Sequence, residues 1–432
     1  MSMGAIGPGA HVASGGGCLI VGAGIIGLAL ALTLQREGLD VTLLDAEEPA
    51  SGASFGNAGY ISEGSILPPA TPDMLLKLPR LLLDRDGPLV IRPSHLPQLL
   101  PWGLRLLAAA RPRRLAEVTQ ALACLNRKAV ASYRPLLKAA GAVDLIDEKG
   151  SLLVYRSLAA LDAKAKQLPL FREHGIGVER IDAGTARQLE PALADHIAGA
   201  LFFPGNARCL DPGALGQRFA ETVLAGGGTL VKARAARLIA EGASWRVVTS
   251  AGEIRADRVV VAAGRWSDDL LRPLGYKVPL ASERGYHLML PTPGVALSRP
   301  VVLAERYFAA TPMRDGLRLA GTAEFAAAGA PPDYRRADIL FDLAAPYLPG
   351  LVKSHATRWM GVRPSLPDAL PAIGRATRHP NLFYSFGHHH VGLTQAAVSA
   401  RLLADVIAGR PSFTQPEAFS LDRFERQPPI SA

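Results

Sequence analysis

The chain has 432 residues, of which 49% are hydrophobic and 20% charged, and its formal net charge is +9. It is long enough for two structural domains, and its composition is ordinary for a soluble enzyme. The basic residues are spread along the chain without a block interleaved with aromatic residues. We therefore expect no nucleic acid partner, whereas an anionic substrate, cofactor or membrane surface would each suit the charge. The three cysteines, Cys18, Cys124 and Cys209, are odd in number and far apart, which argues against disulfides or a zinc site and favours the cytoplasm.

The N-terminal segment, residues 1–16, is rich in glycine and polar residues, and we expect a disordered leader there. A hydropathy scan would flag the apolar stretch that follows. We reject a signal peptide, because it needs a basic N-terminal region and the first Lys or Arg is Arg36, after the apolar run. We also reject a membrane span, because a span needs no spaced glycines with a strand pattern behind them.

Residues 18–45 carry the pattern on which the rest of the interpretation depends. A short apolar run at 18–21 is typical of a buried strand, and it leads directly into a turn that contains Gly22, Gly24 and Gly27. The first glycine allows the tight turn, the second lets a pyrophosphate approach the backbone, and the third lets helix and strand pack closely. The pattern predicts a dinucleotide site. The alternative is a Gly-rich apolar helix that binds nothing.

The residues that follow this turn suit the same ligand. A helix begins at Ile25 and Ile26, and its free N–H groups and positive end favour phosphate groups. A second strand at 41–44 ends on Asp45, next to Ala46. About twenty residues after the glycines, a carboxylate can accept hydrogen bonds from ribose hydroxyls. We therefore expect these four residues to contact the dinucleotide.

A loop of small and polar residues comes next and includes Ser54, Asn57, Ala58 and Gly59. Such a loop lets backbone N–H groups and short side chains approach a ligand closely, although its composition is also usual for a surface loop. Together with the glycine turn and Asp45, it resembles the FAD-dependent amine and D-amino acid oxidoreductases, most of all the bacterial D-amino acid dehydrogenases. The resemblance implies that FAD is the cofactor and that this loop lies beside its pyrophosphate and flavin.

Residues 66–115 hold four Leu-rich stretches separated by prolines, with eight Lys and Arg residues and three Asp residues. Short amphipathic helices that carry Leu, Trp102 and Arg side chains would suit an anionic bilayer surface. The alternative, which we favour here, is that these helices pack on their own core. A peripheral membrane contact would fit the delivery of electrons to a membrane quinone.

A strand of Val and Ala at 259–262 leads into Ala263 and Gly264, followed by Trp266. The small residues indicate a second place where the backbone approaches a ligand closely. In the resembled family, the matching Ala-Gly turn packs against the dinucleotide.

Residues 279–325 are rich in strand patterns. Polar and apolar side chains alternate over 283–290, as in a half-buried strand. Tyr286 and His287 should therefore point to opposite faces, and at most one of them can face a flavin unless the strand has a bulge. This stretch matches the substrate domain of the resembled family, a curved antiparallel sheet over the flavin.

The C-terminal third carries the most specific resemblance. Arg363 lies in a Pro-rich motif at 359–374, and a strand at 382–386 leads into a second motif with a Gly loop and a helix. The helix presents another N-terminus to a ligand. Both motifs resemble the flavin-binding end of the D-amino acid dehydrogenases. The resemblance implies cofactor contacts from Gly361, Gly387, His388, His389, Gly392, Leu393 and Thr394.

In flavin amine oxidation, a hydride leaves the substrate α-carbon for flavin N5, so the site mainly has to position a neutral amine and a carboxylate. We assign the carboxylate clamp to Arg363, because the guanidinium fork binds a carboxylate bidentately and because it matches an arginine with this role in the resembled family. The alternative is a structural ion pair between Arg363 and Asp368. Tyr286 is a candidate hydrogen-bond donor, and His287 or His388 is a candidate base. Weaker candidates for the clamp are Arg284 and Arg306.

The consecutive histidines 388–390 invite a metal site, but three neighbours in one loop cannot easily converge on one ion, and we expect no metal. Some relatives of the resembled family attach FAD through a cysteine near position 361. Gly361 stands there instead, and neither Cys124 nor Cys209 fits. We therefore expect non-covalent FAD, with attachment through a histidine as the alternative.

These observations predict an α/β protein. Its two parts are a Rossmann-like FAD-binding domain of the D-amino acid oxidase type and an α+β substrate domain built on an antiparallel sheet. We assign the FAD domain to residues 17–65, 205–275 and 355–425, and the substrate domain to residues 66–204 and 276–354.

The expected activity is oxidation of a D-amino acid to an imine, with a secondary amine such as a proline derivative among the candidate substrates. Electrons would pass to an acceptor other than oxygen, such as a membrane quinone. The alternatives are a peroxide-forming oxidase of the glycine or sarcosine type, an NAD-linked dehydrogenase, and a non-catalytic nucleotide-binding protein. The expected location is the cytoplasm, with the inner face of the membrane as a peripheral site.

Overall fold

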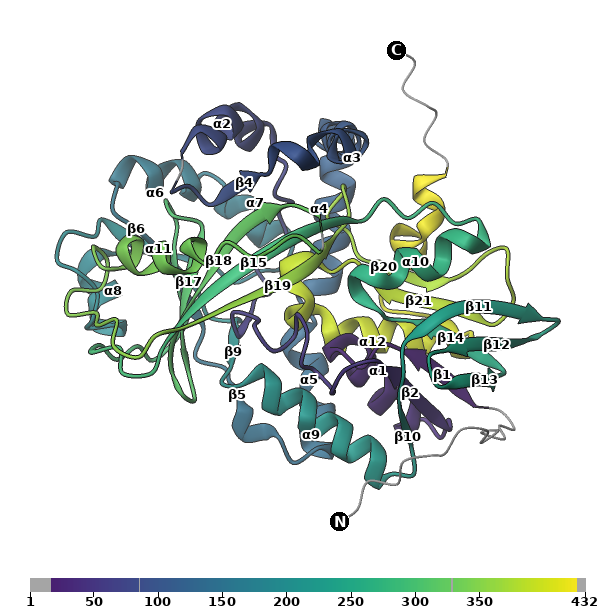
Figure 1. Ribbon diagram of the computed structural model, residues 1–432. Coiled ribbons are helices and arrows are strands. Elements are labelled where there is room, and N and C mark those ends of the chain that lie inside the picture. Colours follow the sequence, from purple (N-terminus) through teal and green to yellow (C-terminus); the bar gives the residue numbers. More distant parts are fainter. Residues whose placement is uncertain (1–16, 85, 328, 426–432) are drawn as a thin grey trace.

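The computed structural model describes residues 17–84, 86–327 and 329–425 (Figure 1). The expected leader, residues 1–16, lies outside the described residues. Two large sheets dominate the molecule, and they lie on either side of the long C-terminal helix in Figure 1.

The first large sheet is the expected dinucleotide-binding sheet. Its strands run in the order β10-β2-β1-β14-β21-β20, and every neighbouring pair is parallel except β20 and β21. Neighbouring residues of β1 point into different cores: Cys18 and Ile20 pack against helices, whereas Leu19 and Val21 pack on the opposite face. The strands are β1 (Cys18–Val21), β2 (Val41–Asp45), β10 (Thr229–Lys232), β14 (Arg258–Val261), β20 (Ala372–Arg375) and β21 (Leu382–Phe386).

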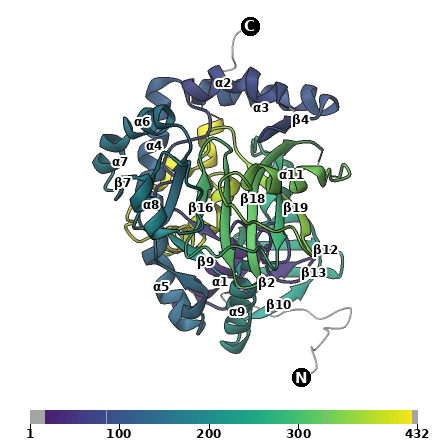
Figure 2. The ribbon, with the colours of Figure 1, turned by 90° about the vertical axis from the view of Figure 1, so that its left-hand side faces the viewer.

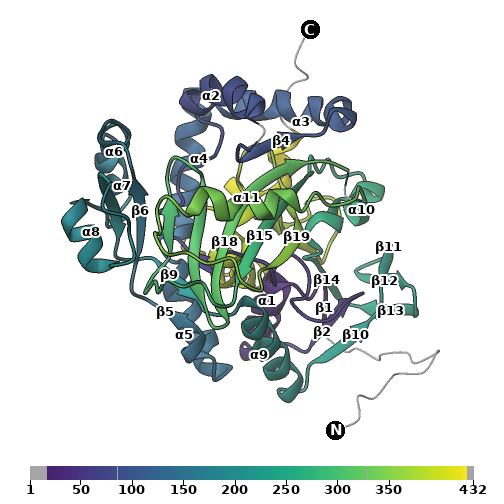
Figure 3. The ribbon, with the colours of Figure 1, turned by 60° about the vertical axis from the view of Figure 1, so that its left-hand side comes forward.

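The two faces of this sheet are covered differently. One face packs against the helices α1 (Ile25–Arg36), α9 (Pro212–Ala225) and α12 (Gly392–Ala408). The other face packs against α10 (Ser267–Leu271) and a three-stranded sheet, which stands out at one side in Figure 3. The strands of that small sheet are β11 (Ala235–Glu241), β12 (Ser244–Thr249) and β13 (Gly252–Ala256).

The second large sheet has nine strands in the order β19-β15-β18-β17-β16-β6-β8-β7, with β4 beside β18. Its pairs are antiparallel, as expected, except β16 with β6 and β18 with β4. The helix α11 (Arg335–Ala344) crosses β15 and β18 on the outer face (Figure 3). The strands are β4 (Leu89–Ile91), β6 (Ser151–Tyr155), β7 (Glu179–Asp182), β8 (Gly199–Phe203), β15 (Ala281–Leu290), β16 (Val301–Leu303), β17 (Phe308–Met313), β18 (Gly316–Phe325) and β19 (Thr357–Ser365).

The remaining elements connect the two large sheets. A small sheet joins β3 (Tyr60–Ile61), β9 (Ala207–Cys209) and β5 (Ile146–Asp147). The other α-helices are α2 (Pro72–Leu83), α3 (Leu96–Ala109), α4 (Pro112–Asn126), α5 (Ala129–Ala139), α6 (Leu158–Ala165), α7 (Leu168–Glu173) and α8 (Ala183–Leu189), and α4 and α5 add side chains to the core around α1 and α12. Of these, α2 and α3 lie next to each other at one end of the molecule (Figure 2).

The assignment of residues to two domains stays a proposal, and one boundary needs a change. The FAD domain was expected to resume at residue 355. Instead, β19 is hydrogen bonded along its whole length to β15, with Ala281 opposite Ser365 and Met289 opposite Thr357. Because β19 is a strand of the nine-stranded sheet, we place 357–365 with the substrate sheet.

One helical stretch among the described residues, His389–Ala408, is long and apolar enough to cross a membrane. It contains α12, and 67% of its most apolar window is buried inside the protein. In the structure this helix packs against α1 and α5, which is the environment of a core helix.

Candidate active site

A cavity of about 1130 Å³ lies between the two large sheets, where β1, β2 and β14 end. It exceeds the range of about 300–1,000 Å³ that is usual for small-molecule sites, and its size suits a dinucleotide together with a substrate. Of the predicted site residues, all of them described, only Gly27, Gly59 and His287 do not line it. The structure thus brings together residues that are more than 300 positions apart in the chain.

The three motif glycines meet different surroundings. Gly22 has a φ of +115°, and a Cβ there would lie 2.3 Å from the Ala262 carbonyl oxygen. A Cβ on Gly27 would lie 1.9 Å from the Gly22 carbonyl oxygen. A Cβ on Gly24 would meet only the Ser54 Oγ, at 3.5 Å. The first and third glycines are therefore required by packing, whereas the second keeps a space open where a phosphate can approach the backbone.

Asp45 and Ser54 hold the ends of this turn. Asp45 accepts hydrogen bonds from the backbone N–H groups of Ala23 at 2.6 Å and Glu47 at 3.1 Å. Each carboxylate oxygen keeps a second lone pair for a ribose hydroxyl. The Ser54 Oγ accepts from the Ile25 N–H at 2.9 Å, at the first turn of α1. The N-termini of α1 and α12 both line the cavity, so two positive helix ends face it and an anionic cofactor fits the site.

The loop at 54–59 is held from the substrate sheet by Arg318, a residue that the sequence analysis missed. Its Nη1 donates to the carbonyl oxygens of Phe55 at 3.1 Å and Asn57 at 2.6 Å. Arg318 is buried, and desolvation lowers its pKa to about 10. Asn57 Oδ1 accepts from the Gly59 N–H at 3.0 Å, so Asn57 shapes its own turn. A basic residue between the apolar residues Leu317 and Leu319 of β18 was the signal that could have identified it.

His287 does not line the cavity, whereas its neighbour Tyr286 does. The pairing of β15 with β18 shifts register between these two residues, yet at most one of them faces the cavity, as the alternating pattern predicts. The His287 Nδ1 lies 3.0 Å from the Gly56 carbonyl oxygen, and because a carbonyl only accepts, Nδ1 carries the proton. Burial and then Arg318 lower the pKa of His287 to about 3. Because His287 is held by this loop and does not line the cavity, its position does not favour the role of base for which it was a candidate.

Trp359 is a second residue that the sequence analysis missed. Its ring stacks on His287 with centroids 5.1 Å apart and an interplanar angle of 14°. A Cβ on Gly56 or Gly361 would lie 2.1 Å or 2.0 Å from the indole. The two glycines therefore leave room for this ring at the cavity wall, where Trp359 and Gly361 both line the cavity.

The histidines of the loop before α12 are used in two ways. His388 is buried, its Nε2 lies 3.0 Å from the Ser399 Oγ, and desolvation lowers its pKa to about 3. The His389 Nε2 accepts from the Leu366 N–H at 3.0 Å. His390 is exposed and lines the cavity. The role of a base that we expected for His388 does not fit a ring that is held by α12. No group of three or more His, Cys, Asp or Glu among the described residues is placed to hold a metal ion.

Arg363 lies at the cavity wall and has an acidic partner that was not foreseen. Its Nη1 donates to Glu283 Oε1 at 2.7 Å and to the Thr322 carbonyl oxygen at 3.2 Å. The register places Glu283 directly opposite Arg363 on the neighbouring strand. A Cβ on Gly285 would lie 2.2 Å from Arg363 Nη2, so the guanidinium lies flat over this glycine.

The charge of Glu283 is stabilised by this arrangement. Burial alone would raise its pKa, but Arg363, His389 and a 2.6 Å hydrogen bond from the Ser365 Oγ outweigh burial and lower the pKa to about 2. Glu283 is therefore ionised at neutral pH. The site presents a fixed Arg–Glu pair to the cavity, which both residues line.

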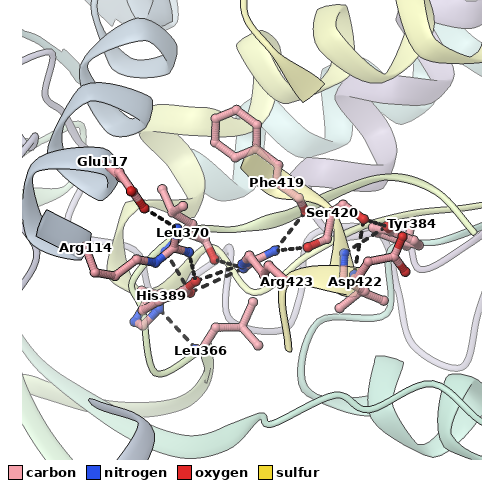
Figure 4. Close-up of polar contacts among 12 residues, drawn as sticks. Arg114, Glu117, Leu366, Leu370, Tyr384, His389, Phe419, Ser420, Asp422 and Arg423 are labelled. Atoms are coloured by element: carbon pink, nitrogen blue, oxygen red, sulfur yellow. Dashed lines mark hydrogen bonds and ion pairs between the residues drawn. The ribbon is translucent and has the colours of Figure 1, made fainter. Parts of the chain in front are cut away.

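Asp368, the alternative partner of Arg363, belongs to a separate cluster with Arg114 and Arg423, and Figure 4 shows these two arginines. Asp368 accepts from Arg114 Nη2 at 3.0 Å and from Arg423 Nε at 2.8 Å. Arg423 also donates to the carbonyl oxygens of Phe419, Ser420 and Leu370. This cluster joins α4 to the C-terminal segment, and the suggested Arg363–Asp368 pair is wrong.

The other candidates are placed as follows. Tyr286 lines the cavity, but its hydroxyl donates to Glu324 at 2.5 Å and accepts from the Asp333 N–H at 3.1 Å. Arg284 is fully buried and donates to the carbonyl oxygens of Ala327 and Pro331. Arg306 is exposed and does not line the cavity. Neither arginine is placed to bind a substrate carboxylate there.

The start of α12 is tied to the other parts of the cavity wall. The Thr394 hydroxyl accepts from the Ser62 N–H at 3.1 Å and donates to the Tyr60 carbonyl oxygen at 3.3 Å. The Tyr133 hydroxyl donates to the Leu393 carbonyl oxygen at 2.6 Å. These contacts fix the helix end that, with Gly392, lines the cavity.

Comparison with known proteins supports this geometry. Residues 18–406 match the model of the DAO family, which is described as FAD dependent oxidoreductase. A D-amino-acid oxidase of Bradyrhizobium diazoefficiens is 37% identical over 424 residues, with 96% of this chain and 99% of the relative covered. A D-amino acid dehydrogenase of the same organism is 32% identical, with 94% and 98% covered.

Solved structures agree on the fold. The glycine oxidase of Geobacillus kaustophilus superposes with a TM-score of 0.72 at 22% identity, and the match covers 94% of this chain and 98% of that one. The L-proline dehydrogenase of P. horikoshii superposes with a TM-score of 0.71 at 17% identity, covering 95% and 98%. With a glycine turn, two helix ends and a cavity that fit FAD, the chain belongs to the DAO family and is an FAD-dependent amino acid oxidoreductase.

Proposed function

We propose that this enzyme oxidises the amine of a D-amino acid, including secondary amines such as proline derivatives, to the imine. The observation that carries the proposal is Arg363 at the cavity wall. Among the described residues, both hydrogen bonds of Arg363 come from Nη1. Nε and Nη2 therefore remain for a bidentate contact with a substrate carboxylate. The D configuration is supported by the names of the relatives, an oxidase and a dehydrogenase of D-amino acids.

The residues of this chain position the substrate and leave the amine unprotonated. Arg363 binds the carboxylate, and Glu283 with the Thr322 carbonyl fixes the direction of its fork. FAD, when bound, supplies the acceptor for the hydride that leaves the α-carbon. His287 and His388 are held by other partners, so we propose that the amine binds in its neutral form without a protein base.

For the acceptor we propose a compound other than oxygen, as in the relatives named dehydrogenases. An oxidase that releases hydrogen peroxide is the second candidate, favoured by the relative named D-amino-acid oxidase. The test is turnover of D- and L-amino acids and of glycine and sarcosine, measured both by reduction of an artificial dye and by peroxide formation in air. Dye reduction with D-amino acids and little peroxide supports the proposal. Activity with glycine or sarcosine alone contradicts it.

We further propose that FAD is held without a covalent bond. Gly361 lines the cavity near the position where some relatives of the resembled family carry the cysteine that binds FAD covalently. The described cysteines do not line the cavity. Acid precipitation of the purified yellow protein should then release all of the flavin into the supernatant. Flavin that stays with the precipitated chain would identify a covalent link, with His390 as the first residue to examine.

A further inference from the structure

The surface made by α2 and α3 has the features of a docking site. Four leucines of α3 recur at spacings of three and four, which places them on one face of the helix. They are Leu96, Leu100, Leu104 and Leu107, with 50%, 63%, 43% and 52% of their surface exposed. We call this set, together with the exposed face of α2, the leucine surface.

The exposed face of α2 repeats the pattern with a basic residue in it. Leu76 and Leu83 are 83% and 84% exposed, and they are seven positions apart. Arg80, also exposed, lies between them on the same face. In every view α2 and α3 lie side by side at the end of the molecule that is remote from α9 (Figures 1–3). The leucines of both helices are therefore presented at one end.

The leucines of α3 cannot turn inward, because the opposite face of the helix is already packed. Leu99 is 7% exposed, and the Trp102 Nε1 donates to the Ser365 carbonyl oxygen at 3.0 Å. The Trp102 ring also packs on Phe325, with centroids 5.2 Å apart. An apolar face that is held outward by such contacts is suited to a partner outside the chain.

The charge of this segment selects the partner. Residues 71–114 contain eight Lys and Arg residues but only three Asp and no Glu. Arg92 and Arg114 pair with the buried Glu324 and Asp368, whereas Arg80 and Arg111 are exposed and do not line the cavity. Leucines flanked by exposed cations are complementary to a bilayer with anionic headgroups. A second copy of the chain would bring like charges together across this surface, which disfavours a dimer.

We propose that the leucine surface docks on an anionic lipid bilayer, with the leucines at the level of the acyl chains and the basic side chains among the headgroups. The inner side of α2 contributes Thr71, Met74 and Lys77 to the cavity wall. Docking therefore places the membrane about one helix diameter, ~10 Å, from the cavity. A lipid-soluble electron acceptor would then have a short path to the site.

The test is co-sedimentation of the FAD-loaded enzyme with phosphatidylcholine vesicles made with and without phosphatidylglycerol. The enzyme should bind the vesicles that contain phosphatidylglycerol and bind the neutral ones at least several-fold more weakly. Raising the ionic strength from about 0.1 M to about 1 M shortens the Debye length from about 10 Å to about 3 Å and should release most of the enzyme. Leu100→Ser/Leu104→Ser should lower the partition coefficient by about tenfold or more, because two apolar side chains are lost from the contact.

The matched control is Val143→Ser/Leu224→Ser, which removes two side chains that are 62% and 45% exposed near the opposite end of the molecule. It should bind as the wild type does. Flavin absorbance and amino acid oxidation show that each variant is folded, and Arg80→Gln/Arg111→Gln tests the charge separately from the leucines. Absence of binding to anionic vesicles, or an equal loss in the control, contradicts the proposal. Self-association in sedimentation velocity that disappears in the leucine variant would make the surface a self-interface instead.

Discussion

Gly24 and Gly27 belong to one glycine motif, yet a methyl group would have opposite consequences at the two positions. At Gly24 the backbone has a φ of −70°, which any residue adopts, and a Cβ would have open space except for the Ser54 Oγ at 3.5 Å. We expect Gly24→Ala to fold normally and to lose FAD, because the methyl group occupies the phosphate approach. Gly27→Ala should destabilise the fold by about 1–3 kcal/mol or more, because its methyl group collides with the Gly22 carbonyl.

The measurement is the flavin-to-protein ratio together with the thermal melt followed by circular dichroism. The expected result is a low ratio with a near-normal apoprotein melt for Gly24→Ala, and a lowered melt for Gly27→Ala. If Gly24→Ala kept its flavin, the pyrophosphate would not lie at this turn.

Arg363 is the residue on which substrate binding depends in this account. Arg363→Ala should retain FAD and lower kcat/KM by about 100-fold or more, mainly through KM, because two hydrogen bonds to a charged carboxylate are lost. Arg363→Lys keeps the charge but not the fork and should recover only part of the loss. Steady-state kinetics with a D-amino acid measures both. The control is Arg306→Ala, which changes an exposed arginine outside the cavity wall and should behave as the wild type. An unchanged KM in Arg363→Ala would contradict the assignment of Arg363 as the carboxylate clamp.

At the scale of elements, the Arg363–Glu283 pair links the neighbouring strands β19 and β15. Glu283 has a folded pKa of about 2, below its ordinary value of 4.5. A lowered carboxyl pKa contributes stability that is present above pH 4.5 and is lost as the pH falls towards 2. The shift corresponds to about 3 kcal/mol.

We therefore expect the wild type to lose stability between pH 4.5 and 2, and Glu283→Gln to lose less over the same range because it has no proton to gain. Urea unfolding of the two proteins at a series of pH values gives the difference. Parallel curves for the two proteins would mean that Arg363 does not stabilise the charge of Glu283.

Patterns within one stretch of chain could be predicted from the sequence, whereas contacts between distant strands could not. The glycine turn, the acid after the second strand and the loop at 54–59 are local patterns whose spacing alone fixes their relation, and the structure places them at one cavity. The Arg363–Glu283 pair joins residues 80 positions apart, and it exists only through the register of β15 with β19. The hydrogen bond of His287 with the Gly56 carbonyl oxygen likewise joins distant parts of the chain, and the alternating pattern of the strand carries no sign of it.

The roles of other residues depend on packing between distant elements. His388 looked like a candidate base because it follows a strand and a glycine, but its ring is held by Ser399 of α12 in the buried core. Arg318 and Trp359 were overlooked because neither belongs to a local motif that indicates a ligand. Their contacts to the loop at 54–59 and to His287 come from elements far away in the chain.

At the scale of the whole molecule, the dinucleotide sheet and the substrate sheet meet at one cavity. The first supplies the glycine turn and two helix N-termini, and the second supplies Arg363 with its partner. The leucine surface lies at the end where α2 forms part of the cavity wall (Figure 2). The proposed membrane contact would therefore lie next to one wall of the cavity.

The most direct test of this account is the visible spectrum of the purified yellow enzyme, mixed without oxygen with D- and L-amino acids in turn and then exposed to air. The account predicts that D-amino acids bleach the flavin bands, that their L enantiomers do not, and that colour returns slowly in air. Rapid return of colour with hydrogen peroxide would make the enzyme an oxidase. Bleaching by L-amino acids alone, or by no amino acid, would contradict the proposed function.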